Sequence, residues 1–196
     1  MLPKSQASRD PFVLKSDMTT DELVHFMVEN GRRWVAAQHE AFQPTSDPIS
    51  EEDRAVLRHY FGHAVLQGSR VCWVEEIANP DFYEEVERAG LPMPLDFRLM
   101  TAITFVDTIV VSRSQFEGPA TWRPLLFHEL VHAVQYRILG LARFVAEYVE
   151  GWARNGFFYE SIPLERMAYE LQGRFDLASS RFSAESEVVR ALGAKG

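Results

Sequence analysis

The feature of this sequence that most constrains its fold is the helical pattern that follows Pro119. Apolar side chains recur there with a helical period, and few turn residues intervene. The pattern predicts one helix from about Trp122 to Leu139, a second from about Leu141 to Asn155, and a third from about Pro163 into the 180s. Such helices bury an apolar face, so the preceding residues must supply the layer against which they pack.

Short strand-like runs in the middle of the chain predict that layer. Val71 to Val74 and two runs between Leu99 and Val111, interrupted at Asp107, are rich in β-branched residues. A short helix is expected from Pro80 to Ala89, followed by an irregular turn over residues 90–94. The expected class is α+β, with a small, mainly antiparallel sheet packed against a helical C-terminal half.

The N-terminal region is expected to be helical as well. Thr19 and Glu22 have the spacing of a capping box, and the apolar residues that follow predict a helix to about Phe42. Two prolines and small polar residues over Gln43–Pro48 predict a linker, and the next helix should start after Ser50. We therefore expect a helical extension and linker over residues 1–48 and a main domain over residues 49–196.

Composition and charge exclude several classes of protein. The chain of 196 residues is 46% hydrophobic and 24% charged, which is typical of one folded domain. A net charge of −8 without a cluster of Lys and Arg argues against a nucleic-acid binder. Cys72 is the only cysteine, so an intramolecular disulfide and a thiolate-rich zinc site are both excluded.

The location of the protein is predicted from the absence of long apolar runs. Residues 1–20 hold no run of signal-peptide length, and no run approaches the roughly 20 residues of a membrane span. We expect a cytoplasmic protein without a membrane partner. The sequence gives no indication of oligomeric state.

The predicted helix after Pro119 carries the residues of most chemical interest. His128, Glu129 and His132 form an H-E-x-x-H arrangement inside it. Residues four apart on a helix project from the same face, so the two imidazoles can bind one ion. Neutral imidazole is a favoured zinc ligand, and a catalytic zinc site combines three protein ligands with a water. Glu129 is then the general base for the metal-activated water as it attacks a carbonyl carbon.

The alternative is that these three residues are ordinary polar positions on an amphipathic helix. Their neighbours argue against it, because the helix is apolar around most of its circumference, at Leu125, Leu126, Leu130, Val131 and Val134. Histidines on such a helix are expected to be at least partly buried, and buried imidazoles need partners, of which a metal is one. We therefore predict that His128 and His132 bind Zn2+.

Three segments of the chain carry a family resemblance: Ala102–Val111, His128–Tyr136 and Ile162–Tyr169. They resemble the H-E-x-x-H zinc metallopeptidases, and within them small bacterial gluzincin-like domains of uncharacterised function. The resemblance spans about Leu99 to Phe175, roughly two-fifths of the chain. It implies a zincin-like fold, a bound zinc ion, and hydrolysis of a peptide or amide bond in a peptide or protein substrate.

The resemblance also implies a third metal ligand. In gluzincins this ligand is a Glu on a later helix, which corresponds to Glu165, and Ser161 is expected to cap that helix before Pro163. Thermolysin-like members carry an Asp four residues after this Glu, whereas this chain has Tyr169. Four other carboxylates stay open as the third ligand: Glu150, Glu147, Glu170 and Glu160.

Other features concern the surroundings of the predicted site. The strand near Thr108–Ser112 should form the edge beside the cleft, where an extended peptide adds as a further strand. Tyr136, Tyr159 and Tyr169 are candidate donors to the oxyanion, and no spacing rule selects among them. His59 and His63 also stand four apart, but no further ligand lies at a suitable spacing, so a surface pair is expected.

Two interpretations of function follow, and a third is kept beside them. The first is a zinc-dependent metallopeptidase-like hydrolase with Glu129 as general base. The second is a catalytically silent zinc-binding domain with a structural or accessory role. The third is a metal-free helical interaction module in which the motif is accidental. Zinc content separates the third from the others, and Glu129→Gln separates the first two.

Overall fold

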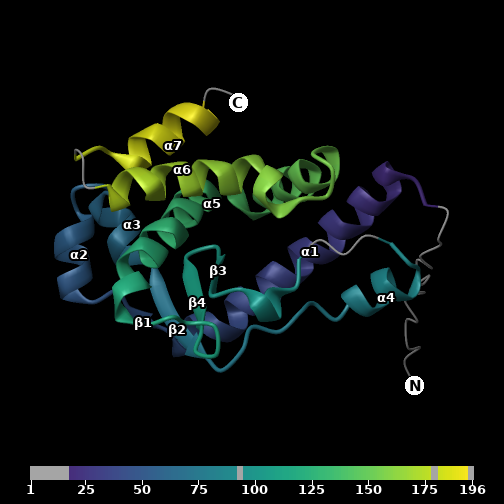
Figure 1. Ribbon diagram of the computed structural model, residues 1–196, viewed down its shortest axis with the longest axis horizontal. Helices are drawn as coiled ribbons and strands as arrows, with labels where there is room; N and C mark the ends of the chain where they lie inside the picture. Colours follow the sequence, from purple (N-terminus) through teal and green to yellow (C-terminus); the bar gives the residue numbers. More distant parts are fainter. Residues whose placement is uncertain (1–17, 92–94, 178–180, 194–196) are drawn as a thin grey trace, which may run out of the picture.

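The computed structural model describes residues 18–91, 95–177 and 181–193. Within these residues the expected α+β class is confirmed, because a four-stranded mixed sheet in the N-terminal half packs against long C-terminal helices (Figure 1). The turn expected over residues 90–94 lies mostly outside the described residues. No helix in the described part of the chain is both long and apolar enough to cross a bilayer.

The sheet has the strand order β1-β2-β4-β3. The strands are β1 (Asp47–Pro48), β2 (Arg70–Val74), β3 (Ala102–Phe105) and β4 (Thr108–Ser112). Two of the three pairings are antiparallel, and β2 pairs with β4 in parallel. The expectation that Thr108–Ser112 forms the edge is wrong: β4 lies between β2 and β3, and all five of its residues are buried. Within the described residues the two edge strands of the sheet are β1 and β3, and β3 is the one that pairs with β4.

Helix α1 (Thr20–Phe42) begins at the predicted capping box, in which Glu22 N–H donates to Thr19 Oγ1 and Thr19 N–H donates to Glu22 Oε2. The short helix η1 (Gln43–Thr45) follows it. The apolar residues of α1 belong to the same core cluster as the rest of the molecule, among them Leu23, Phe26, Met27 and Val35. The division of the chain at residue 48 stays a prediction.

In the part of the chain that the structure describes, four short helices connect the sheet strands to one another, the first two between β1 and β2 and the others between β2 and β3. They are α2 (Glu51–Leu57), α3 (His63–Gly68), α4 (Tyr83–Arg88) and η2 (Phe97–Leu99). Ser50 caps α2 as predicted, because its hydroxyl accepts from Asp53 N–H at 3.1 Å. The carboxylate of Asp53 also accepts from Trp122 Nε1 and Arg123 Nε, which joins α2 to the long helix that carries the motif.

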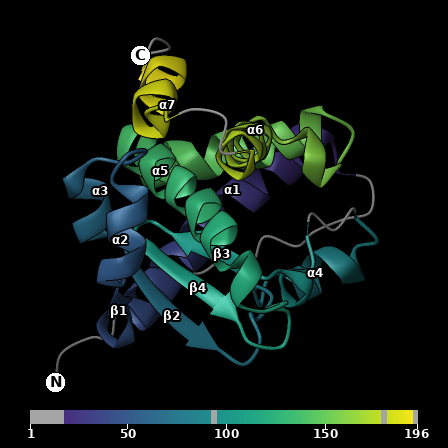
Figure 2. The same ribbon diagram turned by 60° about the vertical axis from the view of Figure 1, so that its left-hand side comes forward.

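That long helix, α5 (Pro119–Arg154), lies against one face of the sheet, and α1 covers the other. Successive residues of a strand point to opposite faces. On β3 the hydroxyl of Thr104 reaches Glu129 of α5, whereas the ring of Phe105 packs against Trp34 of α1 at 5.1 Å between centroids. Figure 2 shows α5 crossing the sheet with α6 and α7 on its outer side.

Helix α5 is bent once, at Gly140, whose φ of 70° and ψ of 161° are not helical. Positive φ is strained for any residue with a Cβ, and a glycine adopts it freely. The predicted break between the second and first helices is therefore confirmed as a kink. After it, the chain continues through η3 (Tyr159–Ser161) to α6 (Pro163–Asp176).

Two predictions for the last part of the chain are wrong. The third helix does not continue into the 180s, because α6 ends at Asp176 and a separate helix, α7, spans Ala184–Gly193. Ser161 does not cap α6 either. The N-cap is Ile162, without a side-chain cap bond, and the first turn begins with Pro163, which has no N–H to satisfy.

Candidate metal centre

Helices α5 and α6 bring together the two predicted histidines and one of the five candidate carboxylates. His128 and His132 lie one turn apart on the first half of α5, and Glu165 lies in the first turn of α6. All three are buried, with 4–6% of each residue exposed. One ligand atom from each lies within 4.8 Å of the others, so the group could hold a metal ion.

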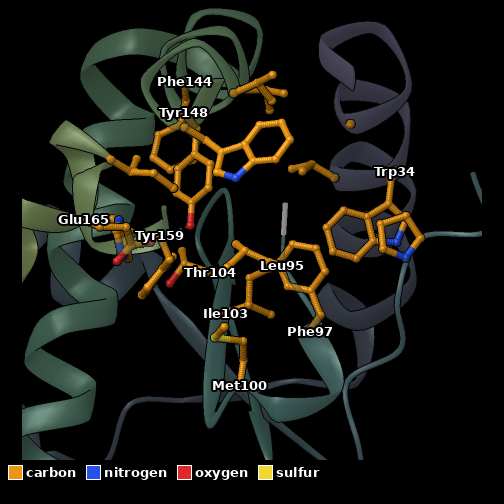
Figure 3. A pocket seen from close by; sticks show the side chains of 18 of the residues that line it. Trp34, Leu95, Phe97, Met100, Ile103, Thr104, Phe144, Tyr148, Tyr159 and Glu165 are labelled. Carbon is orange, nitrogen blue, oxygen red and sulfur yellow. Dashed lines mark hydrogen bonds and ion pairs between the residues drawn. The ribbon is translucent and has the colours of Figure 1, made fainter. Parts of the chain in front are cut away.

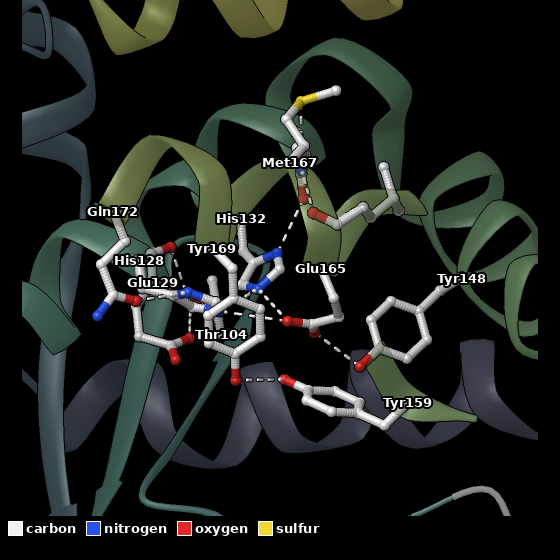
Figure 4. A network of polar contacts seen from close by, with 12 residues as sticks. Thr104, His128, Glu129, His132, Tyr148, Tyr159, Glu165, Met167, Tyr169 and Gln172 are labelled. Carbon is white, nitrogen blue, oxygen red and sulfur yellow. Dashed lines mark hydrogen bonds and ion pairs between the residues drawn. The ribbon is translucent and has the colours of Figure 1, made fainter. Parts of the chain in front are cut away.

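The distances among the three ligand atoms fit a single small cation (Figure 4). His132 Nε2 lies 3.0 Å from His128 Nε2. Glu165 Oε2 lies 3.2 Å from His128 Nε2 and 3.4 Å from His132 Nε2. Ligands placed tetrahedrally at zinc distances of about 2.0–2.2 Å are separated by roughly 3.3–3.6 Å. The side chains are therefore close to the spacing that such an ion requires.

The hydrogen bonds of Gln135 define which nitrogen of His132 faces the centre. The amide nitrogen of Gln135 donates to Leu164 O at 3.0 Å, so its Oε1 is the atom that faces His132 Nδ1, at 2.8 Å. An amide oxygen only accepts, so Nδ1 carries a proton, and in the neutral ring Nε2 carries a lone pair. Gln172 Oε1 lies 3.1 Å from His128 Nδ1, and the same tautomer of His128 satisfies this contact.

When both imidazoles are neutral, the centre therefore collects electron pairs and lacks protons to pair them. Two Nε2 lone pairs and a carboxylate oxygen meet in a site from which water is largely removed, and this arrangement is repulsive unless a positive charge lies among them. The nitrogen and oxygen donors suit zinc and related divalent ions. The residues fit a bound divalent cation.

The electrostatics of the metal-free side chains show the same preference for positive charge. Burial disfavours both charged forms, but the attraction between His132 and Glu165 outweighs it. The pKa of Glu165 falls well below its usual range, and the pKa of His132 rises to about 9. A proton or a metal cation can supply the charge that Glu165 attracts.

Glu129 lies beside this group and is held by the sheet. Thr104 Oγ1, on edge strand β3, lies 2.7 Å from Glu129 Oε2 and 3.1 Å from Glu129 O. A hydroxyl has one proton, and the shorter contact is to the carboxylate. The bond orients one carboxylate oxygen and leaves the other available for a proton. Glu129 lines the same pocket as the three ligand residues.

Tyrosines surround Glu165 and His128. Tyr148, on the second half of α5, donates to Glu165 Oε1 at 2.7 Å, and burial raises the pKa of its phenol well above the usual value, so it remains a donor. The Tyr169 ring lies 4.5 Å from the His128 ring, and its hydroxyl lies 3.4 Å from that of Tyr159. Tyr136 instead stacks on a phenylalanine ring of α5.

The other candidates from the sequence do not join the centre. Glu147 and Glu150 pair with arginines four residues away on α5. Glu160 and Glu170 are exposed. The other histidine pair, His59 and His63, is exposed as expected.

Sequence reasoning missed four residues that organise the site: Thr104, Gln135, Tyr148 and Gln172. Gln135 alone had a sequence signal, because it follows His132 by three residues on one helix and so lies on the same face. Thr104 and Gln172 lie on other elements and Tyr148 lies beyond the kink in α5, so only the folded chain brings them near the centre.

An apolar pocket of about 120 Å³ adjoins the centre. Figure 3 shows it with Glu165 at one end and Trp34 of α1 at the other. Between them lie side chains of β3, of the segment before it and of the second half of α5, including Leu95, Phe97, Ile103 and Phe144. The pocket gives an apolar group direct access to Glu129 and the three ligand residues.

Comparisons of the chain with protein families, with curated proteins and with solved structures found no match. The likeness to gluzincins therefore stays a prediction. The structure itself supports a coarser statement: a buried group of two histidines from α5 and one glutamate from α6, consistent with an H-E-x-x-H site.

Proposed function

We propose that this protein is a zinc-dependent hydrolase of the metallopeptidase kind, which cleaves a peptide or amide bond. The observation that carries the proposal is the convergence of His128 Nε2, His132 Nε2 and Glu165 Oε2 to within 3.0–3.4 Å, with Glu129 in the same pocket. A structural zinc site has four protein ligands, whereas a catalytic site has three and an open position. Three ligands beside a pocket favour catalysis.

The residues of the chain divide the chemistry among them. Zinc bound here supplies a Lewis acid and lowers the pKa of water. Glu129, oriented by Thr104, takes the proton of the attacking water and delivers it to the leaving nitrogen. Tyr148 donates a hydrogen bond to Glu165 Oε1, so that Glu165 Oε2 faces the histidines. The apolar pocket wall limits the water near the reacting bond.

The substrate we propose is a peptide. Within the described residues, β3 pairs only with β4, so its other edge has no partner strand, and Thr104 of β3 contacts Glu129. An extended peptide can add to such an edge through main-chain hydrogen bonds. This position replaces the one expected from the sequence on Thr108–Ser112.

The proposal is tested by zinc content and peptide cleavage together. The purified chain should contain about one zinc ion, and it should cleave members of a broad peptide library. Glu129→Gln should keep the zinc and lower the rate by roughly 10²–10⁴-fold, because only the proton transfer is lost. The matched control is Glu147→Gln, on the same helix but outside the centre, which should change neither property.

Ligand variants complete the test. His132→Ala and Glu165→Ala should each lose most of the bound zinc, because two remaining ligands hold the ion weakly. A chain that binds zinc through these residues but cleaves nothing in the library would instead be the catalytically silent zinc-binding domain. A chain that binds no zinc at all would rule out both.

A further inference from the structure

The proposed chemistry uses the wall of the pocket beside the centre only to limit water, and it does not define what group the pocket binds. Among the described residues that line it, charged or titratable carboxylate and imidazole groups come only from His128, Glu129, His132 and Glu165, at one end. The rest of the lining is aromatic and aliphatic, with tyrosine hydroxyls. A charged group bound away from the centre would lose its water without gaining a partner of opposite charge. The occupant of this part of the pocket is therefore uncharged.

One polar atom in this wall has no partner. Trp152, on the second half of α5, is 1% exposed and lines the pocket, and its indole Nε1 is buried without a hydrogen bond. The ring of Phe157 packs edge-on against the indole ring of Trp152, with 4.8 Å between the ring centroids. Buried donors are nearly always satisfied, and one left unpaired costs about 1–3 kcal/mol. An indole N–H can only donate, so it needs an acceptor.

The volume limits the size of the group that can carry this acceptor. The pocket measures about 120 Å³. An apolar cavity of about 150 Å³ holds one benzene molecule. The space is therefore close to that of a single six-membered ring.

We propose that the pocket binds an uncharged, ring-sized apolar group whose hydrogen-bond acceptor oxygen is held by the N–H of Trp152. A phenol has this chemistry, so the group is the side chain of a tyrosine in the substrate. The placement of that tyrosine beside the cleaved bond rests on the proposed function. The binding of a phenol to the pocket does not, because Trp152 is not one of the ligand residues.

The test uses two small probes, toluene and 4-methylphenol, which differ by one oxygen. Their dissociation constants from the full chain are measured by NMR titration, for the unsubstituted protein and for Trp152→Phe. Phe keeps an aromatic wall and removes the N–H. The ratio of the toluene constant to the 4-methylphenol constant should fall about fivefold in Trp152→Phe, as expected for one lost hydrogen bond.

Trp34→Phe is the matched control, since Trp34 also lines the pocket and its indole nitrogen is not among the buried atoms without a partner. Its ratio should equal that of the unsubstituted chain. An unchanged ratio in Trp152→Phe would overturn the inference and assign the indole N–H to a water molecule. Failure of both probes to bind the unsubstituted chain would overturn it as well.

A direct measurement covers the case in which Trp152→Phe does not fold. Of the four tryptophan indole N–H resonances of the unsubstituted chain, one should move downfield with 4-methylphenol and not with toluene. No such difference would contradict the inference. Both titrations are repeated with EDTA, and neither depends on turnover. Phenol binding without peptide cleavage would thus reject only the proposed function, and cleavage without phenol binding would reject only this inference.

Discussion

At the scale of single residues, one buried amide connects two of the three ligand residues. Gln135 is fully buried, accepts from His132 Nδ1, and donates to the carbonyl of Leu164, the residue before Glu165. The amide thus fixes the tautomer of one ligand and the backbone position of another. When a residue that hydrogen-bonds the second nitrogen of a metal-bound histidine is mutated, the metal affinity commonly falls by about 10- to 100-fold.

The first prediction concerns this amide. Gln135→Leu, which keeps the approximate size of the side chain, should weaken zinc binding by about 10- to 100-fold, because Nδ1 of His132 loses its acceptor. The affinity is measured by competition with a chelator of known strength. Gln38→Leu, on α1 and away from the centre, is the control. Equal zinc affinities for the two variants would show that Gln135 fills space in the core and does not orient His132 for the metal.

The sequence predicted the ligand residues better than the residues that orient them. His128, Glu129 and His132 share one helical turn, so spacing alone brings them together. Glu165 came from a family resemblance, and the structure places it with the histidines. Thr104 and Gln172 could not be predicted from local pattern, because each lies on a separate element that packs against α5. Tyr148 lies on α5 itself, but beyond the kink at Gly140, so helical spacing does not place it beside the histidines.

At the scale of elements, the centre depends on how closely α5 approaches the start of α6. A Cβ added to Gly151 of α5 would lie 2.6 Å from Pro163 Cδ and 3.7 Å from Ile162 Cγ2. Pro163 opens the helix that carries Glu165. The absence of a side chain at Gly151 therefore allows Glu165 to reach the histidines.

Gly151→Ala should accordingly disturb both stability and metal binding. The added methyl group must push α6 away, and overpacking of this kind costs about 1–3 kcal/mol. Gly173→Ala is a matched control, because a Cβ at that helical position meets no atom within 4 Å. The control should stabilise the protein by up to about 1 kcal/mol. Urea unfolding and zinc affinity, measured for both variants, check the prediction; equal behaviour would contradict it.

Two elements show where pattern reading fails. Residues 177–183 contain neither Gly nor Pro, so the sequence had no helix breaker between α6 and α7. Its signal was a serine, Ser183, whose hydroxyl accepts from Ser186 N–H at the start of α7. The edge strand was misassigned for a different reason. Strand order depends on the parallel pairing of β2 with β4, which joins residues far apart in the chain, and hydrophobic period does not encode it.

At the scale of the whole molecule, a bound cation would connect two helices that already share one core. His128 and His132 belong to α5 and Glu165 to α6, and the unfolded chain has no preformed site of this kind. Ligands that bind only the folded state stabilise it by an amount that depends on their concentration relative to Kd.

Zinc should therefore raise the melting temperature of the protein. At a free concentration about 1,000 times Kd the gain is about 4 kcal/mol. For a chain of this size that corresponds to roughly 8–16 °C. Calorimetry of the metal-free protein, before and after zinc addition, measures the shift. His132→Ala should show little of it, and a full shift in that variant would mean that zinc binds elsewhere.

The kink at Gly140 divides α5 into two halves with different tasks. The half before it carries His128 and His132, and the half after it carries Tyr148 and Trp152. Both halves face one pocket. A single backbone bend sets the angle between the two halves. The width of the pocket and the distance from Tyr148 to Glu165 therefore both depend on this one angle. A side chain at residue 140 that straightened the helix would open the pocket and release the carboxylate in one movement.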